Sequence, residues 1–262
     1  MRVEPLQLRI CHLYPDLLNL YGDRGNILTL VQRARWRSIE VEVTETPLGV
    51  PLRAEEHDLF FIGGGEDRQQ ALAAADLRRD KGAALCEGVE KGATVLAVCG
   101  GYQLMGHYYR PAEGDDLPGI GLLDLVTHHP GKVRPRLIGN IVIRADLGYA
   151  GPPRADGLST LVGFENHGGR TTLGPGAHPL GLVQSGFGNN GDDRTEGAVY
   201  RSAYGTYLHG PLLPKNPWLA DHLIAVALKR RHGEVMLPPL DDRVEQEAHQ
   251  AAVRRTRGKQ RG

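Results

Sequence analysis

One cysteine in this sequence has the surroundings of a catalytic nucleophile. Cys99 follows the apolar run 94–98, and small residues stand two positions before it (Ala97) and two after it (Gly101). This spacing is typical of a sharp strand-to-helix turn, because larger side chains would collide where the backbone reverses. A thiol at a helix N-terminus lies at the positive end of the helix dipole, which favours the reactive thiolate. We therefore predict that Cys99 is a nucleophile, although an isolated cysteine at a strand end is more often a buried structural residue.

Two further features match the needs of acyl transfer, which are donors for an oxyanion and a general base. We expect the oxyanion donors to be the backbone N–H groups of Gly100 and of Gly64, in the glycine run that ends the apolar segment 59–62. His209 ends an apolar run and is the histidine best placed to activate the thiol and to protonate a leaving amine. Taken singly, a glycine run is also typical of a flexible turn. A single histidine at a strand end is more often a surface residue or a core residue whose hydrogen bonds are satisfied.

The sequence predicts no metal site. The three cysteines, at positions 11, 86 and 99, lack the paired spacing of a zinc site and are too few for a disulfide framework. His128 and His129 are neighbours, and neighbouring side chains of a strand point to opposite faces, so the two cannot hold one ion.

Apolar strands alternate with helical segments in the first half of the chain. This alternation favours an α/β fold with an open, mostly parallel sheet and helices on both faces. Asp23 is positioned to cap the first helix. In the second half, short strands and glycine-rich turns predict that the same sheet gains extra β-strands. The expected strands are 6–13, 39–43, 59–62, 94–98, 137–143, 161–164, 180–184, 198–200 and 204–208, and the expected helices are 25–37, 66–91 with a break near 80–82, 101–108 and 218–232.

The chain of 262 residues is long enough for one sizeable core. We expect one continuous domain over residues 1–235 and a polar C-terminal tail over residues 236–262 that is exposed and mobile. Residues 254–261, at the end of this tail, are mostly basic. Contact with a membrane and docking of a partner are two functions that this segment could have, although such an end is more often simply solvated.

Composition excludes several classes of function. The 31 basic residues equal the 31 acidic ones, so no global field attracts nucleic acid. No stretch approaches the roughly 20 apolar residues of a membrane helix, and the N-terminus lacks the apolar core of a signal peptide. We therefore expect a cytoplasmic protein.

Several motifs resemble a known enzyme family. Residues 99–103, the glycine run and His209 resemble the Cys-x-Gly-x-Gln motif, oxyanion loop and catalytic histidine of class I glutamine amidotransferases. Segments 61–65, 163–170 and 205–211 resemble the cobyric acid synthase-like branch, and the similarity from 8 to 232 is strongest to glutaminase subunits of lipid II isoglutaminyl synthase. The resemblance implies a flavodoxin-like fold and hydrolysis of L-glutamine to glutamate and ammonia.

The same resemblance implies that Arg136 binds the substrate glutamine and that Gln103 hydrogen-bonds near the scissile amide. An arginine fork suits a carboxylate because two parallel N–H bonds fix its orientation. From the residues alone, Arg136 is more typical of a solvated surface charge than of a ligand-binding residue. For Gln103, packing under the turn is nearly as typical as a hydrogen bond to the substrate.

The chain departs from the common class I pattern at one position. Pro211 occupies the place, two residues after the histidine, where a glutamate usually orients it. Glu165, another distant carboxylate, or a residue supplied by a partner would then complete the catalytic set.

A partner is implied because making an amide from a carboxylate needs ATP, whereas the sequence has no Gly-x-x-x-x-Gly-Lys-Ser/Thr loop. By resemblance, ammonia passes to a Mur-ligase-like synthetase (MurT), which holds ATP and Mg and amidates the D-glutamate of lipid II in peptidoglycan synthesis. We expect no cofactor in this chain.

Three other functions use similar residues. The chain is alternatively a γ-glutamyl hydrolase or cysteine peptidase of related fold, the glutaminase of a cobalamin-type amidation, or a non-catalytic binding subunit. The presence of both Cys99 and His209 disfavours the last of these.

Overall fold

The chain folds around a six-stranded sheet whose central strands are fully buried and almost entirely apolar. The computed structural model describes residues 5–145, 147 and 160–258. Strands β3 (Leu59–Ile62) and β4 (Thr94–Val98) are neighbours, and every residue of both is buried, as expected of strands covered on both faces. The order is β13-β14-β4-β3-β1-β2, and all neighbours pair in parallel except β13 and β14. The other strands are β1 (Gln7–Leu13), β2 (Glu40–Thr46), β13 (Ala198–Tyr200) and β14 (Ala203–Thr206). The predicted mostly parallel sheet is confirmed.

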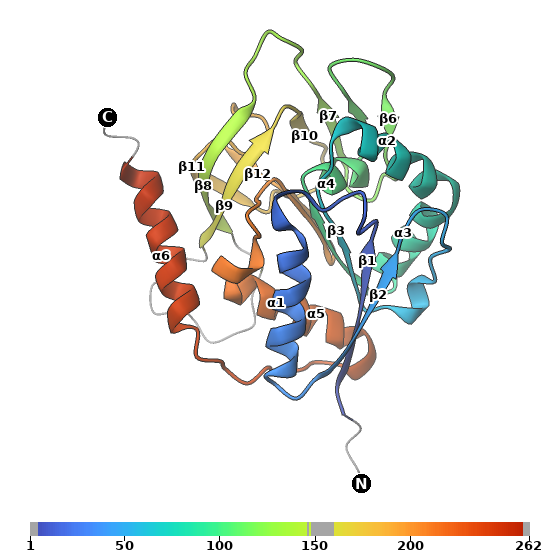
Figure 1. Ribbon diagram of the computed structural model, residues 1–262, viewed down its shortest axis with the longest axis vertical. Coiled ribbons are helices and arrows are strands. Elements are labelled where there is room, and N and C mark those ends of the chain that lie inside the picture. Colours follow the sequence, from blue (N-terminus) through green and yellow to red (C-terminus); the bar gives the residue numbers. More distant parts are fainter. Residues whose placement is uncertain (1–4, 146, 148–159, 259–262) are drawn as a thin grey trace.

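Helices cover both faces of this sheet. Helix α1 (Arg24–Arg35) connects β1 to β2, whereas α2 (Asp67–Asp76) and α3 (Gly82–Glu90) connect β3 to β4 in the opposite direction. Right-handed crossovers in opposite directions place these helices on opposite faces. Helix α5 (Pro217–His232) packs against α1 and against β1, β3 and β4 (Figure 1). The predicted break after α2 is confirmed as a π-helical turn, Leu77–Lys81.

Most strands of the second half do not extend the main sheet, contrary to our expectation. One further sheet has the order β10-β7-β5-β6 and another β12-β11-β8-β9. The outer strand β2 carries exposed glutamates at positions 40, 42 and 45, and charged edges disfavour further pairing. The bounds are β5 (Tyr108–Arg110), β6 (Leu117–Pro118), β7 (Leu125–His128), β8 (Leu137–Ala145), β9 (Thr160–His167), β10 (Arg170–Leu173), β11 (Gly181–Ser185) and β12 (Thr195–Glu196), with short helical turns η1 (Leu20–Gly22), η2 (Ala54–Glu56) and η4 (Leu213–Lys215).

The C-terminal segment is not the mobile tail that its polar composition predicted. Helix α6 (Arg243–Gly258) lies beside β8 and β9 (Figure 1). His249 hydrogen-bonds the Thr160 hydroxyl at 2.9 Å and the Lys215 carbonyl at 2.8 Å, and Thr256 is buried. The helix is amphipathic but strongly polar on average, so its composition hid a helix that docks in part through polar contacts. Residues 259–262, the end of the predicted tail, lie outside the described residues.

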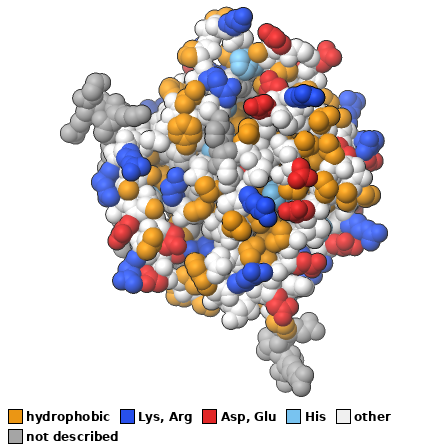
Figure 2. Space-filling model, in the orientation of Figure 1, with side chains coloured by type: hydrophobic (Ala, Val, Ile, Leu, Met, Phe, Trp, Pro, Cys, Tyr) orange, Lys and Arg blue, Asp and Glu red, His pale blue; other side chains and the backbone are white. Residues whose placement is uncertain are grey.

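Surface charge follows the balanced composition. On the face shown in Figure 2, basic and acidic side chains are interspersed. Within the described residues, none of the helices has the length and apolar character needed to cross a membrane.

A buried arginine joins the C-terminal segment to the main domain. Arg33 of α1 is 2% exposed and donates to Asp221 of α5 and to Asp242 before α6, both at 2.7 Å. Arg37 also donates to Asp221 at 2.7 Å. This network ties three distant segments together.

We predict that Arg33→Leu lowers the free energy of unfolding by about 3 kcal/mol, because it leaves two carboxylates short of a partner in a poorly solvated site. Urea denaturation measures the change. The matched control is Arg53→Leu, which removes only the exposed pair with Glu56 and should change stability by less than about 0.5 kcal/mol. Equal effects of the two substitutions would contradict a structural role for the Arg33 network.

Candidate active site

Cys99 occupies a strained turn between β4 and α4 (Gly100–Met105). Its φ of 52° and ψ of −109° are values that side-chain-bearing residues rarely adopt. The Cys99 N–H donates to the Thr206 carbonyl at 2.8 Å, and the Gly101 N–H donates to the Gly63 carbonyl at 3.0 Å. Because these carbonyls end the two strands that flank β4, the sheet itself holds the turn. The predicted strand-to-helix turn is confirmed.

Glycine is required where this turn meets the end of β3. A Cβ on Gly101 would lie 2.8 Å from the carbonyl oxygens of Ile62 and Gly63. A Cβ on Gly64 would lie 3.1 Å from both Cys99 Cβ and His209 Cε1. The glycine run therefore brings backbone against both predicted catalytic side chains.

His209 is buried beside Cys99. It is held by a two-bond bridge to Phe164 of β9, since the His209 N–H donates to the Phe164 carbonyl at 2.8 Å and the Phe164 N–H donates in return at 3.2 Å. Its Nδ1 lies 3.5 Å from Asp23 Oδ1, and its ring also hydrogen-bonds Cys99. Burial alone would lower the pKa of His209, but Cys99 and Asp23 outweigh it and raise this pKa to about 10. An imidazolium poised against a thiolate is the activated state of a cysteine nucleophile.

Asp23 is the acid that the sequence did not identify. It is fully buried and makes no side-chain cap for α1, contrary to the predicted role. Its carboxylate instead accepts the Gly64 N–H at 2.7 Å and pairs with His209. Of the sources considered for the third catalytic group, the distant carboxylate is the one that the structure places beside the histidine.

Pro211, which stands where related enzymes usually have a glutamate, packs against the first helix. A Cβ on Gly25 would lie 2.5 Å from Pro211 Cγ, so the loop after His209 sits directly on the first turn of α1. This contact brings Asp23, two residues before Gly25, to the histidine from the other side.

The Asp23 carboxylate competes for one of the two predicted oxyanion donors. Because the Gly64 N–H donates to Asp23, it is not directed at the space beside Cys99. The Gly100 N–H is the first of α4, where helix geometry provides no intrahelical acceptor. The Gly100 N–H is therefore available for the predicted role, which stays a prediction. The Gly64 N–H could serve as an oxyanion donor only after it breaks its hydrogen bond to Asp23.

A cavity of about 630 Å³ opens over the nucleophile. Ligand sites in proteins have volumes of this order. The walls bring together the predicted Cys99, Gln103 and Arg136 with residues from the loop after β3 and from β9. The lining consists of Leu20, Gly65, Glu66, Asp67, Arg68, Gln70, Cys99, Gln103, Tyr109, Arg136, Asn166, His167, Gly168 and Gly169.

Arg136 is oriented by a neighbouring strand. Its Nε donates to Asn166 Oδ1 at 3.0 Å, and its Nη2 donates to the Asn166 carbonyl at 2.9 Å. Holding one edge of the guanidinium in this way fixes the plane of the fork and leaves its other donors for a ligand. This position at the cavity wall suits the predicted carboxylate-binding role.

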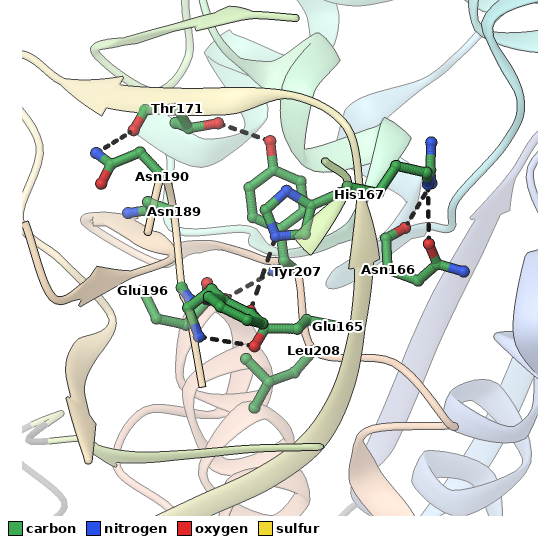
Figure 3. Close-up of polar contacts among 12 residues, drawn as sticks. Glu165, Asn166, His167, Thr171, Asn189, Asn190, Glu196, Tyr207 and Leu208 are labelled. Atoms are coloured by element: carbon green, nitrogen blue, oxygen red, sulfur yellow. Dashed lines mark hydrogen bonds and ion pairs between the residues drawn. The ribbon is translucent and has the colours of Figure 1, made fainter. Parts of the chain in front are cut away.

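Glu165 and His167 of the motif 163–170 lie in a buried polar network with Tyr207 (Figure 3), and Gln103 joins this network. Gln103 Nε2 donates to the Tyr207 hydroxyl at 3.1 Å, and the Tyr207 ring stacks on His167 with ring centroids 3.6 Å apart. Glu165 accepts the N–H groups of Phe187 and Gly188 and lies 3.8 Å from His167. Glu165 therefore serves this network rather than His209, and Gln103 is fixed both under the turn and at the cavity wall.

Glu196 holds the segment that leads to His209. It is fully buried and accepts the Thr206 hydroxyl and the Tyr207 N–H, both at 2.7 Å. Burial raises its pKa to about 7.

The remaining cysteines and histidines do not form a second site. Burial raises the pKa of Cys11 to about 11, and burial also raises that of Cys86, so both thiols are unreactive. His128 bonds Tyr108, whereas His129 accepts the Gly131 N–H. In the described part of the chain, no group of three or more His, Cys, Asp or Glu residues could hold a metal ion.

Sequence reasoning gave no site role to two residues that the structure places against predicted site residues, Asp23 beside His209 and Asn166 beside Arg136. Asn166 stands inside the motif 163–170, which carried the resemblance without an assigned role. For Asp23 no local signal exists, because its partners lie at the end of β3 and after β14.

Comparison with known proteins adds to this geometry. Residues 9–217 match the CobB/CobQ-like glutamine amidotransferase domain. The chain is 43% identical to the lipid II isoglutaminyl synthase (glutamine-hydrolyzing) subunit GatD of Staphylococcus aureus, over 95% of this chain and 96% of that protein. It is 38% identical to the subunit of the same name from Streptococcus pneumoniae, over 93% and 89%. A cobyric acid synthase of Pelotomaculum thermopropionicum is 36% identical over 87% of this chain but only 41% of that protein.

Solved structures support the fold. A structure titled "Crystal structure of glutamine amidotransferase" matches with a TM-score of 0.55, at 15% identity over 83% of this chain and 98% of that one. The PurLQS structure from Thermotoga maritima matches with a TM-score of 0.52, at 16% identity over 85% and 96%. The predicted fold class is confirmed.

We predict that Asp23→Asn lowers the pKa of His209 from about 10 by roughly one pH unit or more, because the imidazolium loses its anionic partner. A pKa raised above the unfolded value of 6.5 stabilises the fold below that pH, and this contribution is lost as the pH rises through about 10. In the variant, this contribution is smaller and its loss is complete at lower pH. NMR titration of the His209 Cε1–H signal measures the shift.

The control is Asp16→Asn, an exposed carboxylate in the preceding loop. It should leave the His209 titration unchanged. A His209 pKa that Asp23→Asn does not move would remove Asp23 from the catalytic set.

Proposed function

This chain belongs to the CobB/CobQ-like glutamine amidotransferase family, and we propose that within it the chain is the glutamine-hydrolysing subunit of a lipid II isoglutaminyl synthase. The observation that carries the proposal is the cluster of Cys99, His209 and Asp23 beside a ligand-sized cavity. Near-complete coverage of the Staphylococcus aureus subunit favours this assignment over the cobyric acid synthase type, in which the chain spans less than half of the relative.

The geometry supports a two-step hydrolysis. The Cys99 thiolate attacks the carboxamide carbon of L-glutamine, and the Gly100 N–H stabilises the resulting oxyanion. The His209 imidazolium gives its proton to the departing nitrogen, so that ammonia leaves and a γ-glutamyl thioester forms. His209 then takes a proton from water, the hydroxide attacks the thioester, and glutamate and the thiolate are released. Asp23 keeps the imidazole oriented and stabilises its charged form through both steps.

Arg136 positions the substrate in this scheme. Its free donors bind the α-carboxylate, which orients the carboxamide toward Cys99. We assign Gln103 a place at the wall near the scissile amide, where Tyr207 holds it.

The released ammonia serves an amidation on a partner protein. We assign the partner to a Mur-ligase-like synthetase (MurT) that uses ATP and Mg to activate the D-glutamate carboxylate of lipid II. Support comes from the word "subunit" in the names of both relatives and from the need to activate a carboxylate before amidation. We propose that this chain needs no cofactor of its own and that the complex works in the cytoplasm, where ATP is available.

We predict that Cys99→Ala abolishes glutamine-dependent amidation of lipid II by the complex, by a factor on the order of a thousand or more. Amidation driven by added ammonium salt should remain at the wild-type rate, because the synthetase acts downstream of Cys99. The assay combines the chain, the synthetase, ATP, glutamine and lipid II and follows the amidated product. Loss of both activities would instead show that Cys99 is needed for assembly.

We predict that Asn166→Ala raises the KM for glutamine about tenfold with little change in kcat, because the Arg136 fork loses its orienting partner. Arg136→Ala should raise KM further, by roughly a hundredfold. Steady-state ammonia release measures both. Arg134→Ala is the matched control, since this nearby arginine pairs with the exposed Asp192 outside the cavity and should leave KM unchanged. An unchanged KM in Arg136→Ala would remove Arg136 from the binding site.

A further inference from the structure

The cavity wall carries opposite charges at separate places. Arg136 contributes a guanidinium, and the loop after β3 contributes the carboxylates of Glu66 and Asp67. L-Glutamine has the matching pattern, because a carboxylate and an ammonium group share its α-carbon. Arg136 accounts for the first group only, and a positively charged ammonium that leaves water needs an acceptor of its own.

We propose that Asp67 binds the α-ammonium group of glutamine and thereby selects substrates with a free α-amino group. The proposal rests on glutamine being the substrate and extends it to a specificity-determining residue. Together, Asp67 and Arg136 would bind the α-ammonium and α-carboxylate groups of glutamine, while its carboxamide lies against Cys99.

Asp67 is held in position from the cavity side. The Tyr109 hydroxyl, on a ring that is 3% exposed, donates to Asp67 Oδ1 at 3.2 Å. Asp67 Oδ2 accepts no hydrogen bond from the residues that the structure describes. Asp67 is exposed at the cavity mouth, and this hydrogen bond limits the orientations of its carboxylate while the second oxygen faces no described donor.

The charges of Asp67 and Arg136 act on the same residues. Burial and Asp67 raise the pKa of Tyr109, whereas Arg136 lowers it. Burial lowers the pKa of His129, Asp67 raises it and Arg136 lowers it again. Tyr109 and His129 therefore lie within electrostatic range of both groups, and a ligand that occupies the cavity feels both.

The other nearby carboxylates fit this role less well. Asp23, Glu165 and Glu196 are fully buried and accept hydrogen bonds from the protein. Glu66 lines the cavity, but no described side chain fixes its carboxylate, and ordering it would cost additional entropy.

The test compares L-glutamine with glutaramate, which is glutamine without its α-amino group, in the complex of the chain with its synthetase. We expect Asp67→Asn to raise the KM for glutamine by about tenfold to a hundredfold, with kcat changed less than about threefold. The kcat/KM for glutaramate should change less than about twofold, since that substrate has no ammonium to lose. Asp67→Glu should recover part of the affinity for glutamine.

Three outcomes overturn the proposal. The first is an unchanged KM in Asp67→Asn. The second is an equal loss with both substrates, which would indicate a structural role at the start of α2. The third is a larger effect of Glu66→Gln than of Asp67→Asn, which would assign the ammonium to Glu66. Wild-type hydrolysis of glutamine separates these results from failure of the proposed function, and Glu40→Gln, on the far strand β2, controls for the change in net charge.

Discussion

The Asp23 carboxylate is the constraint on which the active site depends. One oxygen accepts the Gly64 N–H and the other pairs with His209, so a single buried anion fixes the loop after β3 and the base after β14. A buried carboxylate without partners would be strongly unfavourable, and this requirement forces the three segments together. Cys99 lies between them, because the sheet holds its turn against both neighbouring strands. The nucleophile and its base are therefore placed by the end of the sheet and by one charge.

Strand β9 performs a second positioning role. Phe164 pairs with the backbone of His209, Asn166 orients Arg136, and His167 stacks on the tyrosine that holds Gln103. Residues near the end of one strand thus contact both the side of the cavity at Cys99 and His209 and the side at Arg136. Because successive side chains of a strand point to opposite faces, one strand can contact the catalytic base through its backbone and the cavity through its side chains. This explains why the motif 163–170 clusters so many polar residues.

Local features of the sequence predicted the turn at Cys99 and most of the central sheet. The Cys99 turn is visible because strand, small residues and helix are adjacent in the chain, and β3 and β4 are visible because a strand buried on both faces must be apolar. Asp23 was assigned to a helix cap because that position fits the local pattern, whereas its actual partners are distant in sequence. Helix α6 was missed because the segment is polar on average, and because contacts such as those of His249 join it to residues that are distant in the sequence. The separate sheets of the second half were missed because pairing between distant strands is not encoded locally.

The position of the acid also bears on what the partner must supply. With a glutamate two residues after the histidine, base and acid would belong to one loop. Here Pro211 occupies that place and packs on Gly25, which brings the first turn of α1, and with it Asp23, to His209. The described residues therefore contain an acid, a base and a nucleophile in contact, and Pro211 no longer argues for a carboxylate from another protein. If the proposed partner changes the rate of glutamine hydrolysis, the arrangement of Cys99, His209 and Asp23 points to a cause other than a missing carboxylate, such as a change in cavity shape or in the oxyanion donors.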